Sequence, residues 1–264
     1  MPWIAPSHQA PALLLKTWRP AWFSGLALVL GTMAPDLEFI LRMDNEWIVS
    51  HTLAAQIYFT VPLVAVLYWL TTEWVVPWAT PYLADVAPSH CKTLGRIRLP
   101  PRAAWGSVAV SGALGGLTHI TLDGFTHGGR SGWAVALLPF LRRPVGTAGV
   151  PLHDVLQIVL SLGLALATFR LWTRWMASAA TGERLPGLIR ASAEARARLA
   201  GILAIAALAG AATAQRLHPA LSGVDAAEVA VYGAMDFVAL AVVVGAGWER
   251  LRTSPIRAQA WGGA

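Results

Sequence analysis

The sequence predicts an all-α protein: a polytopic bundle of transmembrane helices that forms a single integral membrane domain over residues 1–264. Of its residues 56% are hydrophobic and only 13% are charged, about half the charged share that is usual in soluble domains. Several apolar segments approach the roughly 20 residues that a helix needs to cross a bilayer. Thirteen Trp are present, most of them at the ends of these segments, where aromatic side chains meet the membrane–water interface.

The first apolar stretch predicts a short helical hairpin. Residues 7–17 and 22–33 each favour a helix, but Pro20 and Pro35 end them early, since the residue before a proline avoids the α conformation. Each piece is too short to span a membrane alone. We therefore expect a re-entrant hairpin over residues 7–33, and a sixth span with a polar N-terminal lead is the alternative.

Five further segments are long and apolar enough to predict clear spans. Pro62 should kink the first of them, because a proline removes a helical hydrogen bond. Gly112 and Gly116, four residues apart in the second, present a small-residue face that lets a neighbouring helix approach closely. Residues 1–130 hold the polar motifs, and residues 150–250 supply mainly bundle helices. The five segments are residues 53–78, 103–123, 154–175, 199–215 and 227–248.

The charge distribution predicts a topology and a lipid partner. The 20 Lys and Arg outnumber the 14 Asp and Glu, and the pI is about 10.2. Most of the basic residues lie in loops on one side of the bundle, where they face lipid headgroups, and the positive-inside rule makes that side cytoplasmic. Membrane lipid is thus the expected partner, and no nucleic acid is expected. Cys91 is the single cysteine, which excludes an internal disulfide and a thiolate zinc site.

Three polar residues at the end of segment 103–123 predict a metal site. His119 and Asp123 are four residues apart and so share one helix face, and His127 follows at the same spacing. Imidazole and carboxylate ligands suit a divalent metal, with zinc as the first candidate and manganese or iron as alternatives. The simpler interpretation is a pair of polar residues that caps the helix end. Ionisable groups are costly in a bilayer, which favours a functional role.

Two other motifs fall on the same side of the predicted bundle. Asp36 and Glu38 follow a helix stop, and His51 lies at the beginning of a span, after Ser50. Taken alone, the two acids could be solvated and His51 could be a polar residue at the membrane interface. Because these residues come from separate segments and end on one face with the motif at the end of segment 103–123, we expect them to converge on one site.

Two further polar positions have several interpretations. Asp236 lies in the middle of an apolar segment, where a carboxylate needs a basic partner, a bound proton or a place on a proton path. His153 and Asp154 begin another span, and there we expect Asp154 to be a favourable acid at a helix N-terminus.

Four stretches of the chain carry a family resemblance: Met1-Pro2 to Ser7-His8, GTMAPDLE at residues 31–38, SHTL at 50–53 and GGLTHITLDGFTH at 115–127. They resemble a bacterial membrane family known as domain of unknown function 4184, which is similar to a wider group of membrane-bound, metal-dependent hydrolases. The resemblance implies a multi-pass protein of the bacterial inner membrane, and the charge distribution then places the site on the extracytoplasmic side. It also implies a metal-binding set, which is His8, Asp36, His51, His119 and Asp123.

Two features of this chain depart from the pattern of the wider group. Glu38 stands where that group has Asp, and Trp47-Ile48-Val49 replaces its His-Arg-Gly lead before the central histidine. The resemblance therefore argues more strongly for a shared site than for a shared reaction.

We expect an integral-membrane, metal-dependent hydrolase that acts on a lipid-linked or amphipathic substrate. A bound metal would activate water toward a phosphoryl or acyl centre. Glu38, beside the predicted ligand Asp36, is the predicted general base, and His127 or His8 would complete the metal shell or protonate the leaving group. The alternatives are a cation- or proton-coupled transporter, and a non-enzymatic membrane scaffold whose His/Asp cluster locks helix packing.

Overall fold

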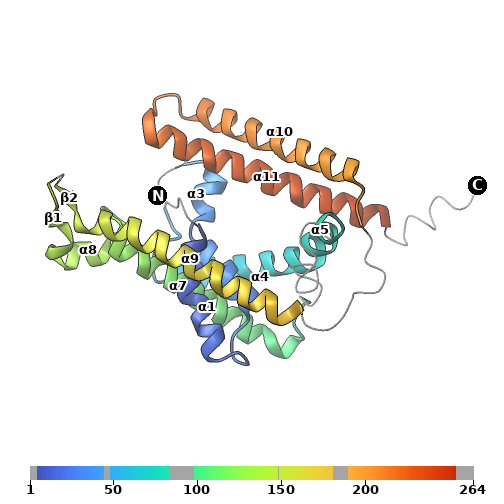
Figure 1. The fold of residues 1–264 in the computed structure, drawn as a ribbon, viewed down its shortest axis with the longest axis horizontal. Helices are drawn as coiled ribbons and strands as arrows, with labels where there is room; N and C mark the ends of the chain where they lie inside the picture. The colour runs from blue at the N-terminus through green and yellow to red at the C-terminus, as the bar shows by residue number, and fades with distance from the viewer. Residues whose placement is uncertain (1–4, 45–47, 84–97, 148, 181–189, 254–264) are drawn as a thin grey trace, which may run out of the picture. The chain divides into compact units, whose positions relative to one another are not determined.

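The computed structural model describes residues 5–44, 48–83, 98–147, 149–180 and 190–253 of the chain (Figure 1). Almost all of the secondary structure in these ranges is helical, which confirms the predicted all-α class. The one sheet that the described residues form is a hairpin of β1 (Pro144–Val145) and β2 (Val150–Pro151). The chain divides into two compact units. Unit 1 is Met1–Glu38, Trp47–Tyr68 and Pro100–Trp175, and unit 2 is Phe39–Glu46, Trp69–Leu99 and Met176–Ala264.

Four helices are long and apolar enough to cross a membrane, and each coincides with a predicted span. They are Gln56–Leu83, Leu152–Arg174, Ala193–Leu217 and Asp225–Arg252. The remaining predicted span, residues 103–123, forms helix α7 (Trp105–Thr126), but this helix is not one of the four. Its Ser, Thr and Gly residues, together with His119 and Asp123, reduce its apolar content. The apolar helices support a membrane protein, whereas the predicted count of five spans and a hairpin is not confirmed.

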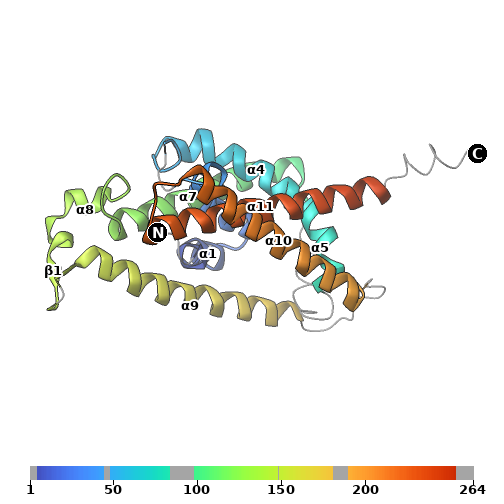
Figure 2. The same cartoon turned by 90° about the horizontal axis from the view of Figure 1, so that it is seen from above.

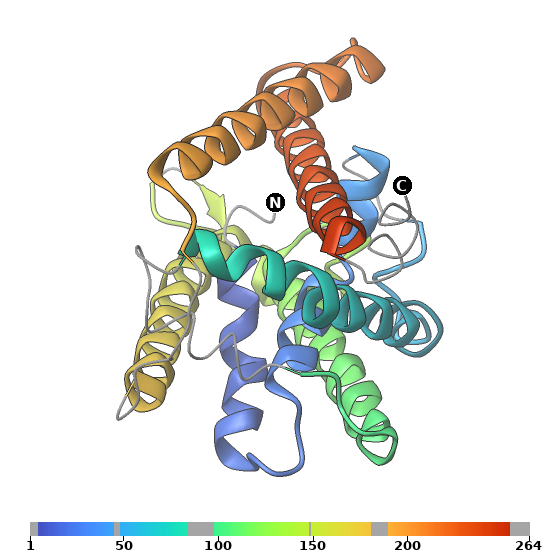
Figure 3. The same cartoon turned by 90° about the vertical axis from the view of Figure 1, so that its right-hand side faces the viewer.

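The N-terminal residues form a helical hairpin, as expected. After a short 3-10 turn, η1 (Ala5–His8), helix α1 (Gln9–Trp18) leads into a turn, and helix α2 (Gly25–Met33) returns. Ser24 caps α2, since its side chain accepts a hydrogen bond from the N–H of Ala27. Both helices pack on α7, and α2 contacts η1, so the hairpin returns the chain to the level where it began (Figure 3).

The turn of the hairpin lies beside the start of α7, and both are at the lower edge of the view in Figure 3. The hydroxyl of Ser107 donates to the carbonyl of Trp22 at 2.6 Å, and the N–H of Ser24 donates to the hydroxyl of Ser111 at 2.9 Å. Because Ser24, before α2, contacts Ser111, and Thr32, near the end of α2, lies against Gly115 one turn farther along α7, the two helices run in the same direction.

The close approach of α2 to α7 depends on glycine. A Cβ added to Gly31 would lie 2.2 Å from the carbonyl oxygen of Gly112, and one added to Gly115 would lie 2.4 Å from a backbone oxygen of α2. A Cβ on Gly116 would lie 2.0 Å from Oε1 of Gln56. The predicted small-residue face of α7 is therefore confirmed, and it extends to Gly115.

The first apolar span is a long helix that contains two wide turns. A π-helical segment precedes Pro62 and a second one precedes Pro77, and neither proline can donate a backbone N–H. The distortion predicted at Pro62 thus takes the form of a π-helical turn before the proline. The successive segments are η2 (Gln56–Thr60), α4 (Val61–Leu70), η3 (Thr71–Val75) and α5 (Val76–Leu83).

Helices α10 (Ala193–Leu217) and α11 (Gly223–Thr253) form an antiparallel hairpin in unit 2 (Figure 1). Their backbones meet at Gly210 and Gly233, where a Cβ on either residue would lie within 2.3 Å of the carbonyl oxygen of the other. Arg196 and Arg198, which precede the predicted span 199–215, belong to the first turns of α10. Residues 181–189 and residues 84–97, which include Cys91, lie outside the described residues.

The chain between α7 and α9 (Leu152–Ala180) folds over the end of α7. The indole N–H of Trp133 donates to the carbonyl of Ile120 at 3.2 Å. Helix α9 then runs along the outside of unit 1, beyond α1 in Figure 2, and Thr168 donates to the carbonyl of Pro6 at 2.6 Å. The remaining short elements are α3 (Leu37–Arg42), η4 (Arg102–Ala104), α8 (Trp133–Leu137) and η5 (Pro139–Arg142).

Candidate metal centre

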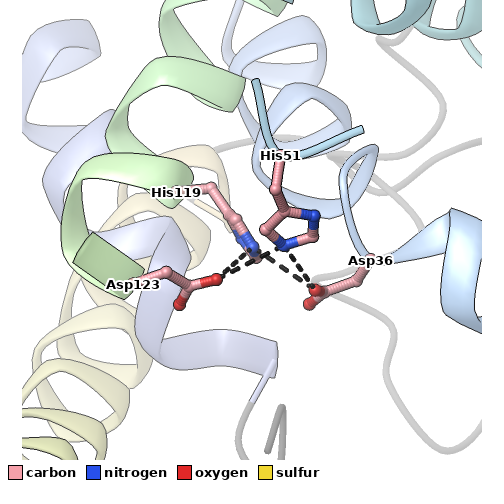
Figure 4. Close-up of side chains that lie close together, drawn as sticks. All are labelled: Asp36, His51, His119 and Asp123. Carbon is pink, nitrogen blue, oxygen red and sulfur yellow. Dashed lines mark ion pairs between the residues drawn. The ribbon is translucent and has the colours of Figure 1, made fainter. Parts of the chain in front are cut away.

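Four side chains of unit 1 point toward one another (Figure 4). Asp36 lies between α2 and α3, His51 lies in the loop before η2, and His119 and Asp123 are one turn apart on α7. One ligand atom from each residue lies within 4.8 Å of all the others. The two imidazoles are at most 2% exposed and the two carboxylates at most 15%. The structure thus brings together four of the five predicted metal ligands.

The separations within this cluster suit a single cation. Nε2 of His119 lies 3.1 Å from Oδ2 of Asp123 and 3.3 Å from Oδ1 of Asp36. Nε2 of His51 lies 3.4 Å and 3.9 Å from the same two oxygens. Two ligands of a tetrahedral zinc ion, each bound at about 2.0–2.2 Å, are about 3.3–3.5 Å apart. The observed distances bracket this value, so two imidazoles and two carboxylates can hold one zinc-sized ion.

His119 provides an independent indication of a cation. Both of its ring nitrogens are buried, and within the described part of the chain neither has a hydrogen-bond partner. Buried polar atoms nearly always have one. Nε2 faces two carboxylate oxygens at short range without donating to either. A neutral imidazole whose Nε2 lone pair binds a metal fits this environment.

Glu38 builds the loop that carries His51. Its carboxylate accepts hydrogen bonds from the backbone N–H groups of Ile48, Val49 and Ser50, at 2.7–3.2 Å. Burial raises the pKa of Glu38, but the hydrogen bonds from the side chain and backbone of Ser50 and from the other two amides outweigh it, so the pKa lies below its usual range. The carboxylate is therefore ionised and fixed.

Ser50 links this carboxylate to the ring of His51. Its hydroxyl hydrogen-bonds to Glu38 and lies 2.9 Å from Nδ1 of His51. When the hydroxyl donates to the carboxylate, its oxygen accepts the Nδ1 proton, and Nε2 of His51 is left unprotonated beside the cluster. With both oxygens engaged by amides, Glu38 is better suited to hold His51 than to act as the general base that the sequence pattern predicts.

The Glu38→Gln variant is expected to bind metal about 10- to 100-fold more weakly, the usual effect of losing a residue that orients a ligand. A glutamine has one acceptor oxygen where Glu38 uses two, so the loop and the tautomer of His51 would no longer be fixed. The measurement is a competition titration against a chelator. Glu194→Gln, at an exposed acid that pairs with Arg198, is the control and should match the wild type. Equal affinities in all three proteins would contradict this role.

A buried glutamine ties the same loop to α7. The amide of Gln56 donates to the carbonyls of Ser50 at 2.8 Å and Thr52 at 2.9 Å. Its oxygen accepts from Thr60 at 2.9 Å and lies where a side chain on Gly116 would be. The sequence motifs did not point to this residue, although a glutamine within a predicted apolar span is the signal that could have identified it.

The second oxygen of Asp123 faces two further predicted residues. Oδ1 lies 3.1 Å from Nε2 of His8 and 3.4 Å from Nδ1 of His127. The ring of His8 also stacks on that of His119, with 4.3 Å between the centroids. The hairpin therefore brings His8 to the cluster, where it contacts the outer oxygen of a ligand. His8 is not one of the four residues whose ligand atoms meet.

His127 is the most open of these histidines, with a side chain 21% exposed against 9% for His8. Burial lowers its pKa to about 4, so the ring is neutral near pH 7. The hydroxyl of Thr126 donates to the carbonyl of Leu122 and lies 3.1 Å from Nδ1, so its oxygen accepts the Nδ1 proton. Nε2 is then an acceptor, and the amide of Gln157 donates to it at 3.2 Å. Gln157, on α9, is a second glutamine within a predicted span that the sequence motifs did not single out.

The other polar positions lie elsewhere. His153 donates to the carbonyl of Leu141 at 3.0 Å, and Asp154 is in the first turn of α9, as expected of a helix N-terminal acid. Asp236 lies on α11 in unit 2, and among the described residues it has no hydrogen-bond or ion-pair partner. The residues described in the structure thus provide no charged partner for it.

Comparison with known proteins gives a family and no function. No curated protein and no solved structure matches the chain. One family model, described as Domain of unknown function (DUF4184), matches residues 1–249. That range contains the four cluster residues as well as Glu38, His8 and His127. The chain belongs to this family of unknown function.

Proposed function

We propose that the protein is an integral-membrane, metal-dependent hydrolase whose metal is held by Asp36, His51, His119 and Asp123. The observation that carries the proposal is the buried His119, which lacks a hydrogen-bond partner among the described residues while its Nε2 faces two carboxylates at near-tetrahedral spacing. Zinc is the first candidate, with manganese or iron as alternatives. When bound, the metal would lower the pKa of a water ligand and polarise a phosphoryl or acyl oxygen.

His127 is the residue to which we assign proton transfer. Its ring is neutral near pH 7, the hydroxyl of Thr126 fixes its tautomer, and it is the histidine of the cluster most open to solvent. Nε2 can therefore accept a proton from water and later return it to the leaving group. Glu38, which the sequence pattern favoured for this step, remains bound to the loop amides.

The substrate class follows from the surroundings of the site. The same chain carries four helices that are long and apolar enough to cross a membrane. A site on such a chain meets substrates that partition into the bilayer, so a lipid-linked or amphipathic ester is the expected substrate. The family resemblance and the positive-inside rule support a bacterial inner membrane with the site on the extracytoplasmic side.

The test is a hydrolysis assay of the full-length, zinc-loaded protein in detergent, with phosphate and acyl esters of lipids as substrates. Hydrolysis should disappear with a chelator and return with metal. The His127→Gln variant should keep its metal and lose at least about 100-fold in rate, the contribution usual for general acid–base catalysis. His153→Gln, a histidine outside the cluster, should behave as the wild type. A His127→Gln variant with full activity would overturn the role of His127.

A structural cluster is the alternative that the distances also allow. A protonated His119 would form ion pairs with both carboxylates and lock α2 and α7 together without any metal. That alternative predicts no bound metal, and it predicts that Asp36→Asn and His119→Gln fold and function with little loss. A wild-type protein that binds no metal, with both variants as stably folded as the wild type, would favour it over the hydrolase.

A further inference from the structure

The turn of the N-terminal hairpin exposes an arginine between two tryptophans. The guanidinium carbon of Arg19 lies 5.1 Å from the ring centroid of Trp18 and 5.4 Å from that of Trp22. Both indoles are well exposed, at 66% and 65%. Within the described residues, Arg19 has no carboxylate partner. The three side chains therefore form a preorganised, exposed cationic group that no described residue of unit 1 neutralises.

The other basic residue in this turn, Lys16, already donates hydrogen bonds to backbone carbonyls. The ammonium of Lys16 donates to the carbonyls of Pro20 and Phe23, the latter at 2.7 Å, and so closes the turn. Its role is to stabilise the hairpin, whereas the guanidinium of Arg19 makes only ring contacts with the described residues. Of the two basic residues in this turn, Arg19 is therefore the one that can bind an anionic ligand.

The hairpin turn lies far enough from the metal centre to be at the opposite surface of a membrane. Ser107, which bonds to Trp22, is 16 residues before Asp123 on one continuous helix, so the turn and the cluster are separated by about 24 Å along α7. Although α7 is not one of the four apolar candidate spans, its 22 residues extend about 33 Å, close to the thickness of a bilayer's hydrocarbon core. A hairpin that follows α7 carries Arg19 from the level of the cluster to the opposite interface, so that its charge lies at the headgroups and not at membrane depth.

We infer that the Trp18–Arg19–Trp22 turn binds the phosphate of an anionic phospholipid headgroup at the membrane surface opposite the metal centre. Arginine offers a planar fork of donors that matches phosphate oxygens, and indole rings favour the interface between headgroups and acyl chains. Stacking between the two indoles holds the guanidinium ready for this contact. The inference is independent of the metal, so a failed hydrolase assay would leave it in place.

The experiment is native mass spectrometry of the full-length protein released from detergent micelles that contain phosphatidylglycerol or phosphatidylcholine. The wild type should retain phosphatidylglycerol in preference to phosphatidylcholine. Arg19→Gln should lower the affinity for phosphatidylglycerol about fivefold, the effect of one basic residue near an anionic surface, and should affect phosphatidylcholine less, because its choline cation offsets the phosphate charge. Arg216→Gln, at an exposed arginine at the end of α10, is the matched control and should retain the wild-type preference.

Three outcomes would overturn the inference: equal retention of both lipids by the wild type, the same loss in Arg19→Gln and Arg216→Gln, or displacement of the lipid by inorganic phosphate at equal concentration. Far-UV circular dichroism of each variant tests its fold and does not depend on whether the protein binds a metal. The wild type supplies a second check without any variant: added salt should weaken retention of phosphatidylglycerol and not of phosphatidylcholine.

Discussion

Replacing Asp123 by Asn is expected to lower metal affinity by well over 100-fold and to abolish metal-dependent activity. Asp123 is the one residue that all four histidines of the site contact: His51 and His119 at Oδ2, and His8 and His127 at Oδ1. The amide has nearly the same shape, but it removes the negative charge and one acceptor. It would also face two of these rings with an NH2 group. Losing a residue that only orients a ligand lowers metal affinity about 10- to 100-fold. Losing a residue that binds the metal directly should lower it further.

The measurement is a chelator-competition titration, with far-UV circular dichroism as a test of folding. Asp154→Asn is the matched control, because Asp154 also pairs with a histidine, at 3.4 Å, but lies outside the cluster. The control should bind metal as tightly as the wild type. Metal affinity within a few-fold of wild type in Asp123→Asn would mean that this carboxylate is not a ligand.

Gly115→Ala is expected to destabilise the protein by about 2–3 kcal/mol, the cost typical of forcing atoms into a packed core. The added methyl would lie 2.4 Å from the carbonyl oxygen of Leu28 and 2.9 Å from the backbone N of Thr32. Backbone atoms cannot rotate away, so α2 would have to move from α7. Because Asp36 follows α2 directly, the same shift should also weaken metal binding.

Gly106→Ala is the control, since the same helix carries this glycine with no atom within 4 Å of the added Cβ. There the change should be neutral or stabilising by up to about 1 kcal/mol, because alanine favours a helix over glycine. Thermal unfolding of both variants in one detergent gives the comparison. Equal midpoints for Gly115→Ala and the wild type would show that α2 and α7 are not packed as closely as described.

Local patterns in the sequence were enough to predict the helices and the motif on α7. Residues spaced by four share a helix face, so the spacing of His119 and Asp123 alone predicts that they form a pair. The length of the apolar segments predicted the positions of the four helices that could cross a membrane. Small residues at intervals of four identified the face of α7 that lets neighbours approach.

Contacts between distant segments were harder to predict, because they depend on how helices pack. His8 and Asp123 are 115 positions apart, and they meet only because the hairpin folds back along α7. Glu38 looked like a free acid beside a ligand, whereas backbone amides of a loop ten to twelve residues later occupy its oxygens. Apolar content alone suggested that α7 crosses the membrane, but the polar residues that build the site also make the helix less apolar.

The central claim is tested most directly by the metal content of the purified, full-length protein, measured by mass spectrometry for the wild type, His119→Ala and Asp36→Ala. His218→Ala, at the turn between α10 and α11, is the control histidine. The account predicts close to one equivalent of zinc, manganese or iron in the wild type and the control, and loss of the metal in both cluster variants. A wild type that stays metal-free after loading with all three ions, or cluster variants that keep a full equivalent, would contradict it.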